Sequence, residues 1–134
     1  MRLPYIIMNR TESVPSGVRL QNLIQNHHAE ILSREKGNDK FIHLYNIGTY
    51  WVAFEQSACR LNGLFPNSEI SLFRVPGLPD YVVMVAVSSD EADAYFCKHM
   101  VFREEYDYKV LAVAPLAAGH YHKWHIGAVR SVLQ

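Results

Sequence analysis

Residues 41–58 read FIHLYNIGTYWVAFEQSA and decide the fold. Phe41–Ile47 is rich in β-branched and aromatic residues, a composition that predicts a strand. Gly48 interrupts this pattern, and the apolar stretch Tyr50–Phe54 predicts a second strand. The residues at 55–61 then predict a short helix. Two strands followed at once by a helix indicate a layered domain in which helices pack on a sheet.

The residues before this stretch predict a long helix between Val18 and Lys36. Gly37 and Asn38 end it, because glycine adopts the left-handed conformation of a helix C-terminus at no steric cost. Leu3–Met8 predicts a short strand or an ordered arm. The residues that recur at helical spacing between 18 and 36 are Leu20, Leu23, Ile24, His27, Ile31 and Leu32.

The residues after this stretch continue the alternation of strands and helices. We expect strands at 70–75, 81–87 and 108–114, of which the Val-rich second one should be buried. Ser88 and Glu91 form a capping box, which predicts a helix over 89–100. The basic tail at 116–134 fits either a strand or a short helix.

These elements fit one mixed α/β domain that spans residues 1–134. Strand pairs separated by short turns indicate antiparallel neighbours. The chain has 134 residues and is 49% hydrophobic with 13 basic and 13 acidic residues, so its net charge is zero. This composition excludes general disorder, and two cysteines are too few for a disulfide scaffold.

No apolar run approaches the roughly 20 residues that span a bilayer, and no secretory leader is recognisable. We therefore expect a cytoplasmic protein with no membrane partner. The zero net charge also argues against tight non-specific binding to duplex nucleic acid, which requires many contacts to phosphate. Local asymmetry exists, because no carboxylate follows Asp107.

Signatures of common enzymes are missing from the sequence. It lacks the phosphate-binding loop, the dinucleotide fingerprint and the nucleophile elbow. Cys59 and Cys97 each fall on an expected helix and are interpreted as small buried hydrophobic residues. Glu104, Glu105 and Asp107 are interpreted as a solvated helix end. We expect no enzyme activity, no cofactor and no small-molecule substrate.

One histidine spacing resembles a metal site. His120 and His122 would share a face of a strand, and His125 could fold back toward them. Zinc sites usually include carboxylate or cysteine ligands and supporting hydrogen bonds. Because the carboxylates end at Asp107, we expect no metal site at these histidines.

The aromatic cluster around Gly48 supplies the candidate binding residues. About half of Tyr45, Tyr50, Trp51 and Phe54 should lie in the core, and exposed rings could stack on bases or wedge between them. The candidate nucleic-acid-binding residues are Tyr50 and Trp51 for stacking, with Arg60, Lys109, Lys123 and Arg130 for phosphate contacts.

Residues 41–58 also resemble the N-terminal, mismatch-recognising domain of the MutS family. The family pattern is a strand ending in a hydrophobic residue and Gly, then Asp-Phe-Tyr-Glu-x-Phe, then a helix that carries Ala. The similarity covers about residues 18–115 and includes Val85–Ser88, the helix to His99 and Asp107–Val113. It implies a mixed sheet packed with helices. The residues that keep the register are Leu44, Tyr45, Ile47, Gly48, Tyr50, Phe54 and Ala58.

The departures from the family pattern shape the expected function. The family's wedging Phe corresponds to Tyr50, and its base-binding Glu corresponds to Val52, which cannot accept a hydrogen bond. Thr49 stands where the family pattern has Asp after the Gly. Because the family's other domains are not in this sequence, we expect a non-catalytic module that binds DNA or RNA weakly. The resemblance implies service to a reverse transcriptase or a repair complex. The alternative is a protein–protein interaction module with the same fold that has lost DNA binding.

Overall fold

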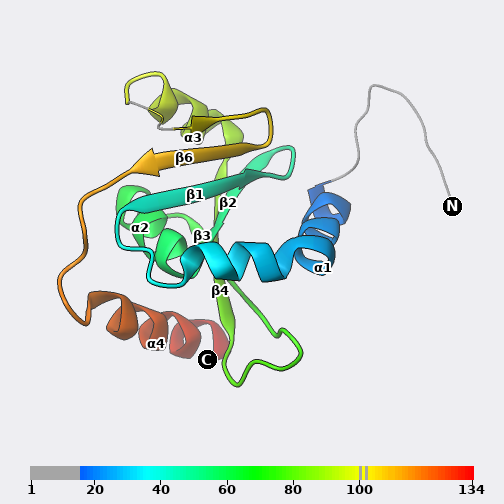
Figure 1. Cartoon of the computed structure of the whole chain (residues 1–134), viewed down its shortest axis with the longest axis vertical. Coiled ribbons are helices and arrows are strands. Elements are labelled where there is room, and N and C mark those ends of the chain that lie inside the picture. Colours follow the sequence, from blue (N-terminus) through cyan, green and yellow to red (C-terminus); the bar gives the residue numbers. More distant parts are fainter. Residues whose placement is uncertain (1–15, 100, 102) are drawn as a thin grey trace, which may run out of the picture.

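The computed structural model describes residues 16–99, 101 and 103–134, and the side chains of 103 and 104 are not described. The arm expected at Leu3–Met8 lies outside these residues. Four helices and six strands alternate along the described chain (Figure 1). Their bounds are α1 (Ser16–Glu35), β1 (Phe41–Asn46), β2 (Tyr50–Phe54), α2 (Glu55–Leu64), β3 (Glu69–Phe73), β4 (Val82–Ser88), α3 (Ser89–Phe96), β5 (Arg103–Glu104), β6 (Tyr108–Ala112) and α4 (His120–Leu133).

The strands form one sheet in the order β3-β4-β2-β1-β6-β5. Every pairing between the described strands is antiparallel. This corrects the mixed sheet that the family resemblance implies, whereas the mixed α/β class is confirmed. The antiparallel order follows from the short connections, because a parallel pair needs a crossover of a dozen or more residues.

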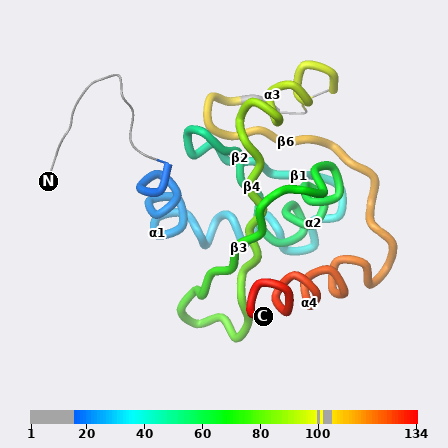
Figure 2. Tube along the Cα trace, turned by 180° about the vertical axis from the view of Figure 1, so that it is seen from behind, coloured from blue at the N-terminus to red at the C-terminus, as the bar shows by residue number. Residues whose placement is uncertain are grey.

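Helices cover both faces of the sheet. Helix α1 packs on one face, over Tyr45, Val52 and Met84. Helices α2 and α3 pack on the other face, and Trp124 of α4 joins the same core. Figure 2, from behind, shows α2, α3 and α4 on the side away from α1. Strand β4 is therefore buried on both faces, as its Val-rich sequence predicts.

The helix starting after Ser88 forms as its capping box predicts. The Ser88 hydroxyl accepts a hydrogen bond from the Glu91 backbone N–H at 3.3 Å and donates to the Glu91 carboxylate at 3.1 Å. The helix is shorter than expected and ends at Phe96. Glu104 belongs to the short strand β5 and Asp107 to a turn, so the expected solvated helix end is wrong. Residues 120–133 form a helix, which resolves the ambiguity of the tail.

A buried carboxyl group stabilises the N-terminus of α2. The N-cap residue Phe54 makes no side-chain cap hydrogen bond. Instead, Glu35 at the end of α1 accepts hydrogen bonds from the Ser57 backbone N–H at 2.9 Å and the Ser57 hydroxyl at 2.7 Å. The amide of Asn38 donates to the same carboxyl at 3.1 Å. Glu35 therefore caps a helix that is distant in sequence.

The Glu35 side chain is only 2% exposed, which changes its titration. Burial raises the pKa of Glu35 to about 7, and the nearby Glu55 carboxylate raises it further, while the bonds from Ser57 and Asn38 lower it. The protonated form is therefore more favoured in the folded chain than in the unfolded chain. Its contribution to stability is complete below the unfolded pKa of about 4.5 and is lost as the pH rises through 7.

This carboxyl should give a pH-dependent stability that Glu35→Gln removes. Relative to this variant, the free energy of unfolding of the native chain should fall by about 3 kcal/mol between about pH 4 and pH 8. Urea unfolding, followed by tryptophan fluorescence, measures the free energy of unfolding of the native chain and of Glu35→Gln. Glu30→Gln, which alters an exposed carboxylate on the same helix, is the control and should track the native chain. A constant difference between the native chain and Glu35→Gln across this range would contradict the assignment.

Candidate functional site

The candidate nucleic-acid site is the turn between β1 and β2. Gly48 has a φ of +108°, a conformation that favours glycine. The Ile47 N–H donates to the Tyr50 carbonyl at 2.9 Å, and the Ser89 hydroxyl donates to the Gly48 carbonyl at 2.9 Å. The turn is thereby fixed between the sheet and the start of α3. It leaves Tyr50 40% exposed at the first position of β2.

A second exposed ring lies at the same end of the sheet. Tyr106, in the turn between β5 and β6, is 90% exposed. The Asn46 N–H donates to the Asp107 carbonyl at 2.9 Å, which joins the two turns. We call this end of the molecule, with Tyr50 and Tyr106, the tyrosine end. Sequence analysis missed Tyr106, although an aromatic residue within an acidic run is itself a signal of exposure.

Acidic groups surround the tyrosine end. Exposed carboxylates come from Asp90 and Glu91 at the start of α3 and from Glu105 and Asp107 in the second turn. They disfavour close approach of phosphates.

Arg19 and Lys109 lie at this end, and both are engaged. Arg19 donates to the Asn46 carbonyl at 3.1 Å. The Lys109 ammonium lies 4.3 Å from the centre of the Phe96 ring and 5.1 Å from that of Trp51.

Two expected binding residues are buried, which corrects their expected surface roles. Trp51 is 3% exposed and packs edge-on against Phe96, with ring centres 5.6 Å apart. Successive strand residues face opposite sides, so Trp51 turns into the core when Tyr50 faces outward. Arg60 is buried in α2 and donates to the Asn38 carbonyl at 3.2 Å. Val52 is also fully buried, so its side chain is not part of the molecular surface.

The remaining expected cations lie far from the tyrosine end. Lys123 and Arg130 are exposed on α4, which crosses the opposite end of the molecule in Figure 1. The expected set of six residues is therefore not one surface. Tyr50 and Lys109 share one end, two residues are buried, and two lie on α4.

The three tail histidines are not arranged as on a strand. They lie on helix α4, where His120 and His122 point in different directions because successive residues are about 100° apart. His125 is buried and its Nε2 lies 3.1 Å from the Tyr81 carbonyl oxygen. Within the described residues, no group of three or more histidines, cysteines or acidic residues could hold a metal ion.

The two cysteines differ in their surroundings. Cys59 is buried in α2, as expected, and burial raises the pKa of its thiol to about 11. Cys97 is exposed just after α3, which corrects the expectation that it is buried. None of the described helices is long and apolar enough to cross a membrane.

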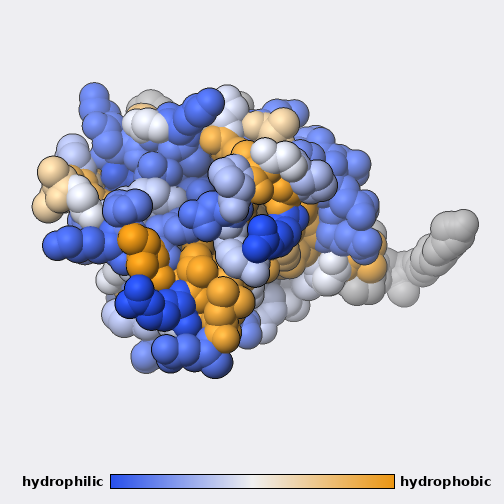
Figure 3. Space-filling view, turned by 90° about the horizontal axis from the view of Figure 1, so that it is seen from below, coloured by the Kyte–Doolittle hydropathy of each residue, from blue (hydrophilic) through white to orange (hydrophobic). Residues whose placement is uncertain are grey.

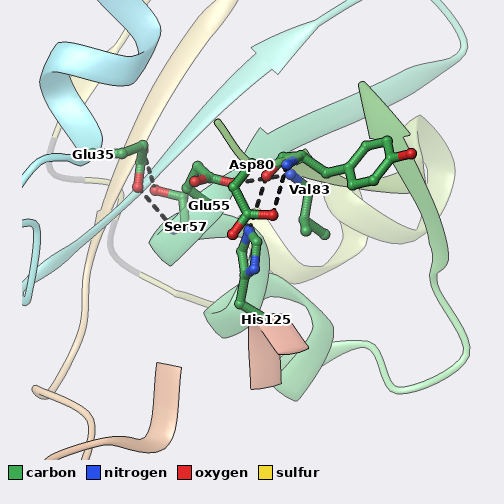
Figure 4. A network of polar contacts seen from close by, with 7 residues as sticks. Glu35, Glu55, Ser57, Asp80, Val83 and His125 are labelled. Carbon is green, nitrogen blue, oxygen red and sulfur yellow. Dashed lines mark hydrogen bonds and ion pairs between the residues drawn. The ribbon is translucent and has the colours of Figure 1, made fainter. Parts of the chain in front are cut away.

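A polar network that sequence analysis missed lies at the opposite end of the molecule. Figure 3 views this end from below and shows hydrophobic groups exposed between hydrophilic ones. The network centres on Glu55, which follows β2 directly and has a φ of +52°. Its carboxylate accepts a hydrogen bond from the Val83 N–H at 2.8 Å and lies 3.4 Å from His125 Nε2 (Figure 4). Burial and this carboxylate raise the pKa of Tyr121.

This network connects elements that are distant in sequence. Glu55 joins the start of α2 to β4 and α4, and Asp80 lies beside it in Figure 4. A hollow of about 270 Å³ borders Glu55, Asp80 and His125. No sequence signal could reveal the network, because its partners lie 28 and 70 residues after Glu55.

Comparison of the chain with protein-family models, with curated proteins and with solved structures finds no match. The function therefore has to be argued from the geometry of the chain itself.

A side chain at Gly48 should destabilise the turn that carries Tyr50. A Cβ atom there would lie 3.0 Å from the Ser16 hydroxyl, in addition to the strain of the positive φ. Gly48→Ala should lower the free energy of unfolding by roughly 1–3 kcal/mol. Gly63→Ala in α2 is the matched control, because nothing lies near its Cβ position. It should raise stability by about 0.5–1 kcal/mol. Equal changes in the free energy of unfolding for Gly48→Ala and Gly63→Ala, measured with urea, would contradict the description of the turn.

Proposed function

We propose that this chain is a non-catalytic accessory module that binds unpaired bases of DNA or RNA through the tyrosine end. The observation that carries the proposal is the exposure of two rings, Tyr50 and Tyr106, at neighbouring turns joined by a backbone hydrogen bond. Base–aromatic stacking contributes about 1–3 kcal/mol per base and tolerates any sequence.

The charges at the tyrosine end favour unpaired over paired bases. A duplex presents two phosphate backbones to the exposed carboxylates, including Asp90 and Asp107. A single strand or a base displaced from a mispair can reach the rings with fewer phosphates nearby. Buried Val52 offers no hydrogen bond to a base. The preference for unpaired bases therefore depends on stacking and on how easily a base reaches the two tyrosine rings.

The resemblance of residues 18–115 to the MutS N-terminal domain supports the same proposal. In that family an aromatic residue at the position of Tyr50 wedges beside a mispaired base. A module of this kind would serve a larger assembly, such as a reverse transcriptase or a repair complex, in the cytoplasm.

Fluorescence anisotropy at low salt tests this function with single-stranded, mismatched and fully paired probes. We expect micromolar or weaker binding to the first two and weaker binding to the paired probe. Tyr50→Ala and Tyr106→Ala should each cost about 1–3 kcal/mol of binding free energy. Arg19 and Lys109, described cations of this end, already hold partners within the chain, so log Kd should change with log salt by a slope of about 1 in magnitude.

The controls lie at the opposite end of the molecule. Tyr81→Ala and the pair Lys123→Ala and Arg130→Ala should leave the affinity unchanged. Absence of binding to every probe at about 100 μM protein, or binding that ignores both tyrosines, would exclude the proposal.

A protein–protein interaction module is the second candidate function. It is favoured by the exposed hydrophobic residues Leu78, Ile126 and Leu133 around α4. A photo-crosslinking residue at position 126 should capture a specific protein other than a second copy of this chain, whereas one at position 18 on α1 should not. The captured protein would then be purified, and Ile126→Glu should weaken its measured affinity.

A further inference from the structure

Helix α4 carries an apolar stripe that the described chain leaves uncovered. Ile126, Val129 and Leu133 follow one another at intervals of three and four residues. Ile126 is 43% and Leu133 60% exposed, while the buried side of α4 is formed by His125 and Ala128. This spacing is that of the a and d positions by which two helices pack along a common seam. We call Ile126, Val129 and Leu133 the α4 stripe.

The α4 stripe forms the floor of a shallow groove. A hollow of about 410 Å³ borders Ile126, Val129 and Leu133. Asp80, from the loop between β3 and β4, borders it on one side, where the Tyr81 carbonyl lies beside His125. Arg130 borders it on the other side, since residues 125 and 130 are about 140° apart around the helix, one on each side of the α4 stripe. The groove thus has an acidic flank and a basic flank.

The position of α4 leaves the groove accessible. The helix lies along the lower edge of the fold in Figures 1 and 2, outside the sheet and its other helices. The C-terminal half of α4 lies next to the loop that carries Asp80 in both views. A second helix could therefore approach the α4 stripe from below.

We propose that the groove is filled by α4 of a second copy of this chain, in a two-fold symmetric dimer with the two helices parallel. A two-fold axis parallel to both helices places the acidic flank of each copy against the basic flank of the other. Asp80 of one copy then meets Arg130 of the second copy, and the contact occurs twice. An antiparallel pair would instead place Asp80 against Asp80 and Arg130 against Arg130.

The charges therefore select both the partner and the orientation. A stripe with heptad spacing fits itself, and its two flanks are complementary only in the parallel arrangement. A single helix pair buries less than the roughly 1,200 Å² at the lower end of standard interfaces, so the dimer should be weak. This surface is distinct from the tyrosine end, so the proposal does not depend on nucleic-acid binding.

Sedimentation velocity of the full chain over a concentration series tests the dimer. The native chain should show a reversible monomer–dimer equilibrium, and Ile126→Glu should shift it to monomer at all concentrations. Val18→Glu is the matched control, because Val18 is exposed on α1, and should dimerise like the native chain. Circular dichroism confirms that each variant is folded. A native chain that stays monomeric up to about 1 mM, or a dimer that Ile126→Glu leaves intact, would overturn the proposal.

A mixing experiment tests the parallel orientation. Asp80→Arg and Arg130→Asp should each weaken self-association by at least about tenfold, because like charges then face each other. An equimolar mixture of the two variants should regain the native affinity, since each heterodimer has two opposite-charge contacts. Self-association that is lost on Ile126→Glu but not restored by mixing would refute the parallel arrangement.

Discussion

The buried carboxyl of Glu35 is the constraint on which the rest of the structure depends. It lies at the end of α1 and accepts three hydrogen bonds, two from Ser57 and one from Asn38. Ser57 in turn accepts a hydrogen bond from the His43 N–H of β1 at 2.9 Å. One side chain thus connects α1, the following turn, β1 and α2. Loss of the Glu35 carboxyl would leave buried donors unsatisfied, each at a cost of about 1–3 kcal/mol.

This constraint fixes the corner between β2 and α2. Because Ser57 is held by Glu35, the chain must turn sharply after Phe54, and Glu55 adopts its positive φ there. The Glu55 carboxylate is then directed to β4 and α4, which positions the loop and helix at the lower end. The tyrosine end is built separately, from Gly48 and the start of α3. The two proposed binding surfaces therefore depend on separate sets of contacts.

Buried Glu35 and half-buried His43 give opposite pH dependences to stability. Burial and the charge of Arg34 lower the pKa of His43 to about 4, so its contribution is present above its unfolded pKa of 6.5 and is lost as the pH falls. Glu35 contributes in the opposite sense, because its pKa is raised. Between about pH 4.5 and 6.5 the two partly offset each other, so the native chain should vary less in stability than either group alone implies.

Local pattern predicted much of the fold, and tertiary contacts determined the rest. The spacing of Leu20 to Leu32 and the capping box of Ser88 act within a few residues, so the sequence displays them directly. Alternation placed Tyr50 and Trp51 on opposite faces but could not reveal which face α3 covers. Arg60 was expected to contact phosphate, whereas its burial depends on the Asn38 carbonyl, 22 residues away in sequence. The Glu55 network joins residues far apart in sequence, which no local pattern records.

The central claim, that Glu35 is a buried carboxyl joining α1 to α2, is tested most directly by its own titration. NMR of the side-chain carboxyl carbon of Glu35, assigned by comparison with Glu35→Gln, follows its protonation in the folded chain. The structure predicts a midpoint near pH 7. A midpoint near 4.5, the value of an ordinary glutamate, would show that this carboxyl is solvated and would contradict the account.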